Sequence, residues 1–155
     1  MQLVASFKAK LKALLSQGAT PNRLAASLAV GVALGLFPLP FTTYLCIAAG
    51  ALFRLNHPAL QLANWGLYPL QLPGMVFFVI WGNRIFSDVP LPAAAELTRL
   101  LRASPLAFAR QFGWAVAQGV AVWAVAAPVL ALVLFFPLAF ALRRAMARND
   151  LQGPA

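Results

Sequence analysis

Three long stretches without charge constrain the fold of this sequence more than any other feature. Residues 24–53, 55–83 and 111–142 contain no Asp, Glu, Lys or Arg. Each stretch exceeds the roughly 20 apolar residues that an α-helix needs to cross about 30 Å of hydrocarbon. We therefore predict an all-α integral membrane protein, built as a single membrane domain over residues 1–155.

The charge distribution indicates how such a chain is oriented. Only 10% of the residues are charged, against about 25% in soluble domains, and twelve Lys and Arg outnumber three acids. The basic residues lie beside the apolar stretches and form no stripe interleaved with aromatic residues, which is typical of topology signals and not of nucleic-acid binding. Because both ends of the chain are basic, we expect a multi-pass protein with cytoplasmic termini and anionic membrane lipids as partners.

Two surface helices are predicted outside the apolar stretches. Residues 1–20 form a basic amphipathic pattern in which Lys8, Lys10 and Lys12 border an apolar arc, so these lysines are expected to anchor the helix at the lipid surface. The alternative is a helix that packs on the rest of the protein. Residues 87–104 mix charged residues with leucines and predict a second amphipathic helix.

A long transmembrane helix is predicted over residues 105–142, followed by a basic tail at 143–155. Its uncharged part, 111–142, would measure about 48 Å as a straight helix, which is too long for one untilted crossing. Pro128 and Pro137 are the expected kinks.

Two similar proline motifs interrupt the other two stretches. The motif GLFPLP occupies residues 35–40, and GLYPLQLP occupies residues 66–73. They predict paired proline-broken hairpins over 24–53 and 58–83, because proline removes a helical hydrogen bond and its ring clashes with the preceding turn. The arms of these hairpins are expected at 21–36, 41–53, 58–67 and 74–83.

The simplest topology makes 24–53 re-entrant and 58–83 a broken crossing outward, so that 84–110 is external and 111–142 crosses back. Alternatives are a sharply broken crossing at 24–53, or hairpins that all remain on the inside. The repeated motif also has two explanations: an internal repeat, or coincidence in a chain rich in Leu, Phe and Pro.

The motifs suggest where function resides. Helix breaks at membrane depth are tolerated only inside protein or against a wet cavity, and repeated broken helices line the substrate sites of transporters. The candidate substrate path comprises the prolines and the polar or aromatic residues beside the breaks: Pro38, Pro40, Thr42, Thr43, Tyr44, Asn64, Tyr68, Pro69 and Gln71. For the polar side chains, bonding between helices is the alternative. Arg54 and Arg84 flank the motifs and are candidate ligands of an anionic headgroup, with interfacial anchoring as the alternative.

Catalytic groups are scarce in these stretches. The chain has one His and one Cys, and none of the three stretches contains a carboxylate. No His, Cys and carboxylate residues have metal-ligand spacing. We therefore expect neither an enzyme nor a metal or other cofactor, and a pump with a carboxylate relay is disfavoured.

Several stretches between Ala26 and Gly82 resemble one bacterial family. They are GVALGLFPLP, the polar break RLNHP, and ANWGLYPLQLP followed by an apolar arm that ends in Gly. Over this third of the chain the sequence resembles the domain-of-unknown-function 2062 family of small bacterial inner-membrane proteins. That family commonly has an Asn-Pro pair in the second break, where this chain has Tyr68-Pro69. The resemblance implies a bacterial inner-membrane location and no particular activity.

Two functions remain as hypotheses. The first is an oligomeric translocator or scramblase of a lipid-like or anionic amphiphile, whose path runs through the paired breaks. The second is a membrane interaction protein that transports nothing and binds anionic lipid or a partner membrane enzyme. A polar cavity at mid-membrane would favour the first, and tight, dry packing of both hairpins would favour the second.

Overall fold

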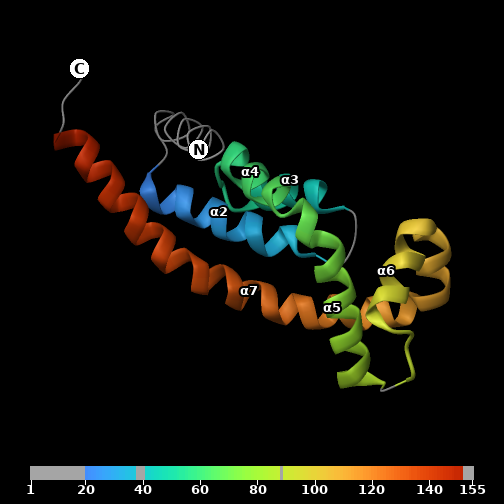
Figure 1. The fold of residues 1–155 in the computed structure, drawn as a ribbon. Helices are drawn as coiled ribbons and strands as arrows, with labels where there is room; N and C mark the ends of the chain where they lie inside the picture. Colours follow the sequence, from blue (N-terminus) through green and yellow to red (C-terminus); the bar gives the residue numbers. More distant parts are fainter. Residues whose placement is uncertain (1–19, 38–40, 88, 152–155) are drawn as a thin grey trace.

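The computed structural model describes residues 20–37, 41–87 and 89–151, and all regular structure in these ranges is α-helical (Figure 1). This confirms the predicted all-α fold for the described part of the chain. Six helices occupy it: α2 (Pro21–Gly35), α3 (Thr42–Leu52), α4 (His57–Gly66), α5 (Tyr68–Phe86), α6 (Ala94–Ala103) and α7 (Pro105–Leu151). The basic segment with Lys8, Lys10 and Lys12, and the break residues Pro38 and Pro40, lie outside the described residues.

The helices begin where the sequence supplies a cap and a proline. Thr20 Oγ1 accepts a hydrogen bond of 3.3 Å from the Arg23 N–H at the start of α2, and Asn56 Oδ1 accepts one of 2.9 Å from the Ala59 N–H at the start of α4. A proline occupies the first turn of α2, α4 and α5, where the N–H that it lacks would have no partner within the helix. The predicted starts of α2 and α4 are therefore correct to within about one residue.

The two proline motifs end their helices in the same way. Gly35 is the last residue of α2, and Gly66 is the last residue of α4. The leucine after each has nearly the same backbone angles: φ −90° and ψ 6° at Leu36, φ −92° and ψ 1° at Leu67. The repeat in sequence is thus also a repeat in local structure.

The second break is shorter than the sequence predicts. A second arm is predicted at 74–83, whereas α5 begins at Tyr68, directly after the cap of α4, and ends at Phe86. Pro69 lies in the first turn of α5, so it helps to begin this helix and does not unwind it. Pro73 lies inside the helix, where the missing N–H removes one backbone bond without ending the helix.

Helix α7 is interrupted at a different place from the predicted one. Pro128 and Pro137 lie inside α7 on its exposed side, whereas the residue with non-helical angles is Phe112, at φ −116° and ψ 17°. The Phe112 ring packs on the ring of Phe108, which is buried in a core shared with α5 and α6. The kink therefore follows tertiary packing, since prolines on the outer side of a long helix are compatible with gentle curvature.

Two other predicted bounds also change. Helix α6 covers only Ala94–Ala103 of the predicted 87–104, and α7 extends past residue 142 to Leu151, so the predicted basic tail begins as helix. Pro90 and Pro92 explain the late start of α6, because a proline disfavours helical backbone at the residue before it.

Helix α7 is the spine on which two groups of helices pack (Figure 1). Helix α2 packs along α7 toward its C-terminus, α4 packs on α2 and α3 packs on α4; these three helices are called the α2–α4 group. Helices α5 and α6 join its N-terminal half and are called the α5–α6 group. Each group has its own core of buried side chains: Leu24, Ala25, Ala59, Ala139 and Leu142 in the first, and Met75, Val76, Val79, Leu97, Leu101, Phe108, Ala115 and Val116 in the second.

The arms on either side of each proline motif have their main partners elsewhere. Helix α2 packs chiefly on α7 and α4, while α5 packs on α7 and α6. Helix α2 runs antiparallel to α7, since Arg143 donates hydrogen bonds of 3.0 and 2.8 Å to Asn22 Oδ1, and Trp123 Nε1 donates one of 3.0 Å to the Ala33 carbonyl. Both α2 and α5 are therefore held chiefly by α7.

Candidate functional site

Helices α2 and α4 lie side by side and point in the same direction. Their contacts keep one register: Ser27 with Asn56, Gly31 with Leu60, and Gly35 with Asn64. Gly31 makes this approach possible, because a Cβ there would lie 2.8 Å from the Ala63 Cβ and closer still to the Leu60 carbonyl oxygen. Small residues allow helix backbones to come this close.

The parallel arrangement brings the ends of the two motif-bearing helices together. A Cβ on Gly35 would lie 3.3 Å from Asn64 Oδ1 and 3.3 Å from the Leu67 Cβ, so the end of α2 touches the last turn of α4. We call this place the paired helix ends, defined by Gly35, Leu36, Asn64, Gly66 and Leu67. It is where the described parts of the two proline motifs meet.

A short series of polar contacts leads along α4 to the paired helix ends. Gln61 Nε2 donates a hydrogen bond of 3.2 Å to the Thr43 carbonyl, and Asn64 Nδ2 approaches Gln61 Oε1 at 3.5 Å. The side chains of Asn64 and Thr42 are buried. These contacts tie α3 to α4, which is a common role of polar side chains between apolar helices.

Other predicted path residues face outward. Tyr44 is 72% exposed and Tyr68 is 74% exposed. Tyr44 lies between the buried Thr42 and Cys46 on α3, and the helical period turns it to the opposite side. Two more of the predicted residues are at most partly covered: Pro69 and Gln71. The structure therefore does not bring the two tyrosines into a common path.

Arg54 and Arg84 do not form a joint anion site. Arg54 closes α3 in the left-handed conformation, with φ 52°, and the Leu55 N–H bonds back to the Gly50 carbonyl at 3.0 Å. Arg84 belongs to the other group, in the last turn of α5, where its guanidinium lies 5.9 Å from the centroid of the Trp81 ring. Both side chains are exposed, each on its own part of the molecule.

Ser27 is a site residue that the sequence analysis misses. Its buried hydroxyl donates a hydrogen bond of 2.7 Å to the Arg23 carbonyl and accepts one of 2.8 Å from the Asn56 N–H. Because Asn56 caps α4, this one hydroxyl fixes the start of α4 against α2. The available signal is the four-residue spacing of Ser27, Gly31 and Gly35, which places small residues along one helical face.

A second glycine contact and a buried polar cluster mark the crossing of α5 and α7. A Cβ on Gly82 would lie 2.5 Å from the Gln118 carbonyl carbon. The neighbouring Asn83 donates a hydrogen bond of 2.7 Å to the Val89 carbonyl, and Gln118 Nε2 donates one to Ser87 Oγ. Asn83 and Gln118 are buried, and Gln118 Oε1 has no partner among the described residues. The cluster holds the loop after α5 against α7.

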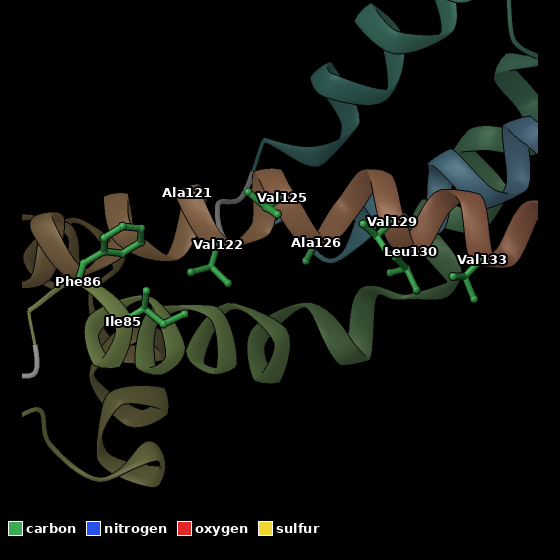
Figure 2. A pocket seen from close by; sticks show the side chains of 9 residues that line it. All are labelled: Ile85, Phe86, Ala121, Val122, Val125, Ala126, Val129, Leu130 and Val133. Carbon is green, nitrogen blue, oxygen red and sulfur yellow. The ribbon is translucent and has the colours of Figure 1, made fainter.

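An open apolar groove of about 590 Å³ follows α7 from the end of α5 (Figure 2). Its lining comes from two helices: Ile85, Phe86, Ala121, Val122, Val125, Ala126, Val129, Leu130 and Val133. Further along, α7 exposes other large apolar side chains, including Phe136 and Phe140. Among the described helices, α7 is the one that is long and apolar enough to cross a membrane, by length and composition.

Ion pairs and clusters of ionisable side chains are scarce in the described ranges. Their one ion pair joins Arg99 to Glu96 at 2.7 Å on the surface of α6, where the hydrogen-bonded guanidinium lowers the pKa of Glu96. No three His, Cys, Asp or Glu side chains in these ranges lie close enough together to hold a metal ion. What the described residues offer is therefore close helix packing, exposed apolar surface and exposed arginines.

Comparison with known families covers almost the whole chain. The family model described as "Uncharacterized protein conserved in bacteria (DUF2062)" matches residues 4–149. The match includes both proline motifs and extends well beyond residues 26–82. No curated protein and no solved structure matches the chain significantly. The chain therefore belongs to the bacterial family DUF2062, as its motifs indicate.

Proposed function

We propose that the protein resides in the bacterial inner membrane and that α7 crosses the lipid. Arg144 lies 4.3 Å from the Phe140 ring centroid, and Arg84 lies over Trp81 close to the crossing at Gly119. Arginine and aromatic residues are typical of membrane–water interfaces. The helix from Gly119 to Phe140 is roughly 32 Å long at 1.5 Å per residue, which suits a hydrocarbon core of about 30 Å.

The same placement favours a re-entrant α2–α3 segment and a broken crossing through α4 and α5. Helix α2 starts beside Arg143, and the turn before α4 returns to α2 through the bond between Asn56 and Ser27. Helix α5 ends beside α7 at Gly119, on the opposite side. In this topology both termini are cytoplasmic, and several exposed arginines share that side: Arg23, Arg54, Arg143 and Arg144.

We infer that the protein binds anionic lipid through its interfacial arginines and transports nothing. The observation that carries this choice is the tight packing of α2 on α4, where Gly31 leaves no room for a Cβ against Leu60. A translocation path through the breaks needs polar space at this place. The groove lies instead on α7, and its lining is apolar.

Translocation is the second candidate, because one observation favours it. Two helix ends of matching conformation meet beside the polar side chains of Gln61 and Asn64, and the broken helices of transporters meet at their substrate sites in a similar way. If a path opens there, α2 and α4 have to move apart at the contact between Gly31 and Leu60.

Reconstitution of the full chain distinguishes these functions. We expect no protein-dependent exchange of fluorescent anionic lipid between vesicle leaflets, and we expect anionic lipid to be enriched in protein purified from mixed-lipid vesicles. Exchange that requires the protein and is lost in Asn64→Leu would establish translocation instead. Lipid extracts with the same composition as the vesicles would contradict the binding function.

Cysteine labelling tests the proposed membrane placement separately. In a Cys46→Ala background, Arg54→Cys should react with an impermeant thiol reagent only from the cytoplasmic side, and Arg102→Cys only from the outside. Reaction of both positions from one side would contradict a crossing through α4 and α5.

A further inference from the structure

We propose that the apolar groove on α7 holds one acyl chain of an anionic phospholipid, whose headgroup lies at Arg84. This inference rests on the proposed membrane placement and names the lipid site that the placement leaves open. Every residue that lines the groove has an apolar side chain. The groove is also open along its length, so a flexible aliphatic chain can enter from the surrounding lipid.

The groove has about the length of one lipid leaflet. Its lining on α7 runs from Ala121 to Val133, which is roughly 18 Å of helix. Half of the hydrocarbon core is about 15 Å. Figure 2 shows Ile85 and Phe86 at one end of the row of α7 side chains and Val133 at the other. An acyl chain that enters beside α5 therefore reaches about the middle of the bilayer when it fills the groove.

Arg84 is the basic residue next in sequence to the α5 end of the groove. It directly precedes the lining residue Ile85, it is exposed, and its guanidinium lies over the ring of Trp81, which is 44% exposed. A guanidinium binds phosphate through parallel hydrogen bonds, and tryptophan with arginine marks the level of lipid headgroups. In this assignment, an apolar groove with a cation beside its α5 end selects a lipid with net negative charge over a zwitterionic one.

Photolabelling of the full chain in vesicles tests this assignment. The probe is phosphatidylglycerol with a diazirine near the methyl end of one acyl chain. We expect labels at Val129, Leu130 and Val133, and a probe with the diazirine near the carbonyl should label Ile85 and Phe86. Labels spread evenly over the exposed apolar residues of α3 and α7 would overturn the proposal.

Matched variants sharpen the result. Ala126→Phe fills the groove and should reduce labelling of Val133 about tenfold, a difference of about 1.4 kcal/mol in binding. Ala124→Phe, at an exposed position of α7 outside the lining, should leave the labelling unchanged. Equal labelling in both variants would exclude the groove as the binding site.

The headgroup is tested without changing the groove. Arg84→Gln should reduce the preference for phosphatidylglycerol over phosphatidylcholine about fivefold, whereas Arg102→Gln, at an exposed position of α6, should not. Because both residues are on the surface, both variants are expected to fold. An equal preference for phosphatidylglycerol in the two variants would show that Arg84 does not bind the headgroup.

Other occupants give distinct results. The variant Val129→Cys, made with Cys46→Ala, tests whether a second copy of the chain fills the groove. Disulfide-linked dimers of this variant, together with no lipid labelling of the groove, would overturn the proposal. If the groove carries no label while purified protein still retains anionic lipid, this inference fails and the proposed function stands.

Discussion

The two groups of helices pack on the same α7 but use glycine differently. In the α2–α4 group, Gly31 and Gly35 line one face of α2 and let α4 run parallel along it. In the α5–α6 group, Gly82 and Gly119 allow one close crossing, and the rest of the contact is made by larger apolar side chains such as Phe108. Helices α2 and α4, which carry the repeated motif, thus form a parallel pair, whereas the α5–α6 group meets α7 at a single close crossing.

The hydrogen bonds follow the same division. In the α2–α4 group, bonds to Ser27 and from Trp123 join elements that are distant in the chain. In the α5–α6 group, Asn83 bonds within the loop after α5, and Gln118 joins that loop to α7. In the proposed membrane placement, the surrounding lipid is as apolar as a protein core, so burial alone drives little association between the helices. The α2–α4 group should therefore depend more on individual hydrogen bonds, and the α5–α6 group more on its crossing.

Gly82→Ala should have the largest effect on stability. Its Cβ would lie 2.5 Å from the Gln118 carbonyl carbon, so α5 and α7 have to separate, and overpacking of this kind costs about 3 kcal/mol. Gly113→Ala, on the same α7, is the control because no heavy atom lies within 4 Å of its Cβ; it should stabilise the helix by about 0.5–1 kcal/mol. Thermal unfolding in detergent measures both. Equal midpoints would contradict the close crossing.

Ser27→Ala should have the next largest effect, with a loss of stability of about 1 kcal/mol, because the partly buried Asn56 N–H is left without its acceptor. The comparison between groups predicts a much smaller effect for Thr98→Ala, whose hydroxyl bonds only the Ala94 carbonyl on the surface of α6. Unfolding midpoints in the same detergent test this difference. Similar losses in both variants would mean that the bond between α2 and α4 adds nothing to an ordinary helical hydroxyl contact.

Trp123→Phe should cost about 1 kcal/mol, because it removes the hydrogen bond to the Ala33 carbonyl and keeps an aromatic ring beside Phe37. Trp114→Phe is the control, since Trp114 is 75% exposed and lies in the part of α7 that packs on α5 and α6. The measurement is again the unfolding midpoint, followed by circular dichroism because tryptophan emission changes in both variants. A larger loss of stability in Trp114→Phe than in Trp123→Phe would contradict the importance of the bond to Ala33.

The starts and ends of α2 and α4 are the part of this fold that local sequence predicts well. The caps at Thr20 and Asn56, and the glycines that end α2 and α4, act within a few residues. The partners of each helix depend on contacts between segments far apart in the chain. The hydrophobic periodicity does not predict that α4 lies parallel to α2, or that α7 is interrupted at Phe112 and not at Pro128.

The candidate site divides in the same way. Asn64 and Thr42 are predicted from their place beside the breaks and are buried there, whereas Tyr44 and Tyr68 are exposed because facing depends on the helical register. Ser27 escapes sequence analysis because a serine in an apolar helix commonly bonds its own backbone. Only the structure adds the second bond, to the start of α4.

Arg54→Gly should have the smallest effect on stability and, unlike the substitutions of Ser27 and Trp123, should be stabilising. Arg54 has φ 52°, a conformation that costs a residue with a Cβ about 1 kcal/mol. Glycine removes this cost but loses more entropy on folding, so we expect a net gain of about 0.5 kcal/mol. Arg54→Ala is the control, since it removes the charge and keeps the Cβ, and it should give no gain.

Lipid binding separates the two consequences of changing Arg54. Both substitutions remove one exposed cation from the proposed cytoplasmic side, so both should reduce the enrichment of phosphatidylglycerol in purified protein to the same extent, by up to about fivefold. Only glycine relieves the backbone of the turn. If the two variants differ in stability but not in lipid enrichment, the turn and the charge act independently. Equal stability would contradict strain at Arg54, and undiminished enrichment would place the anionic lipid at other arginines.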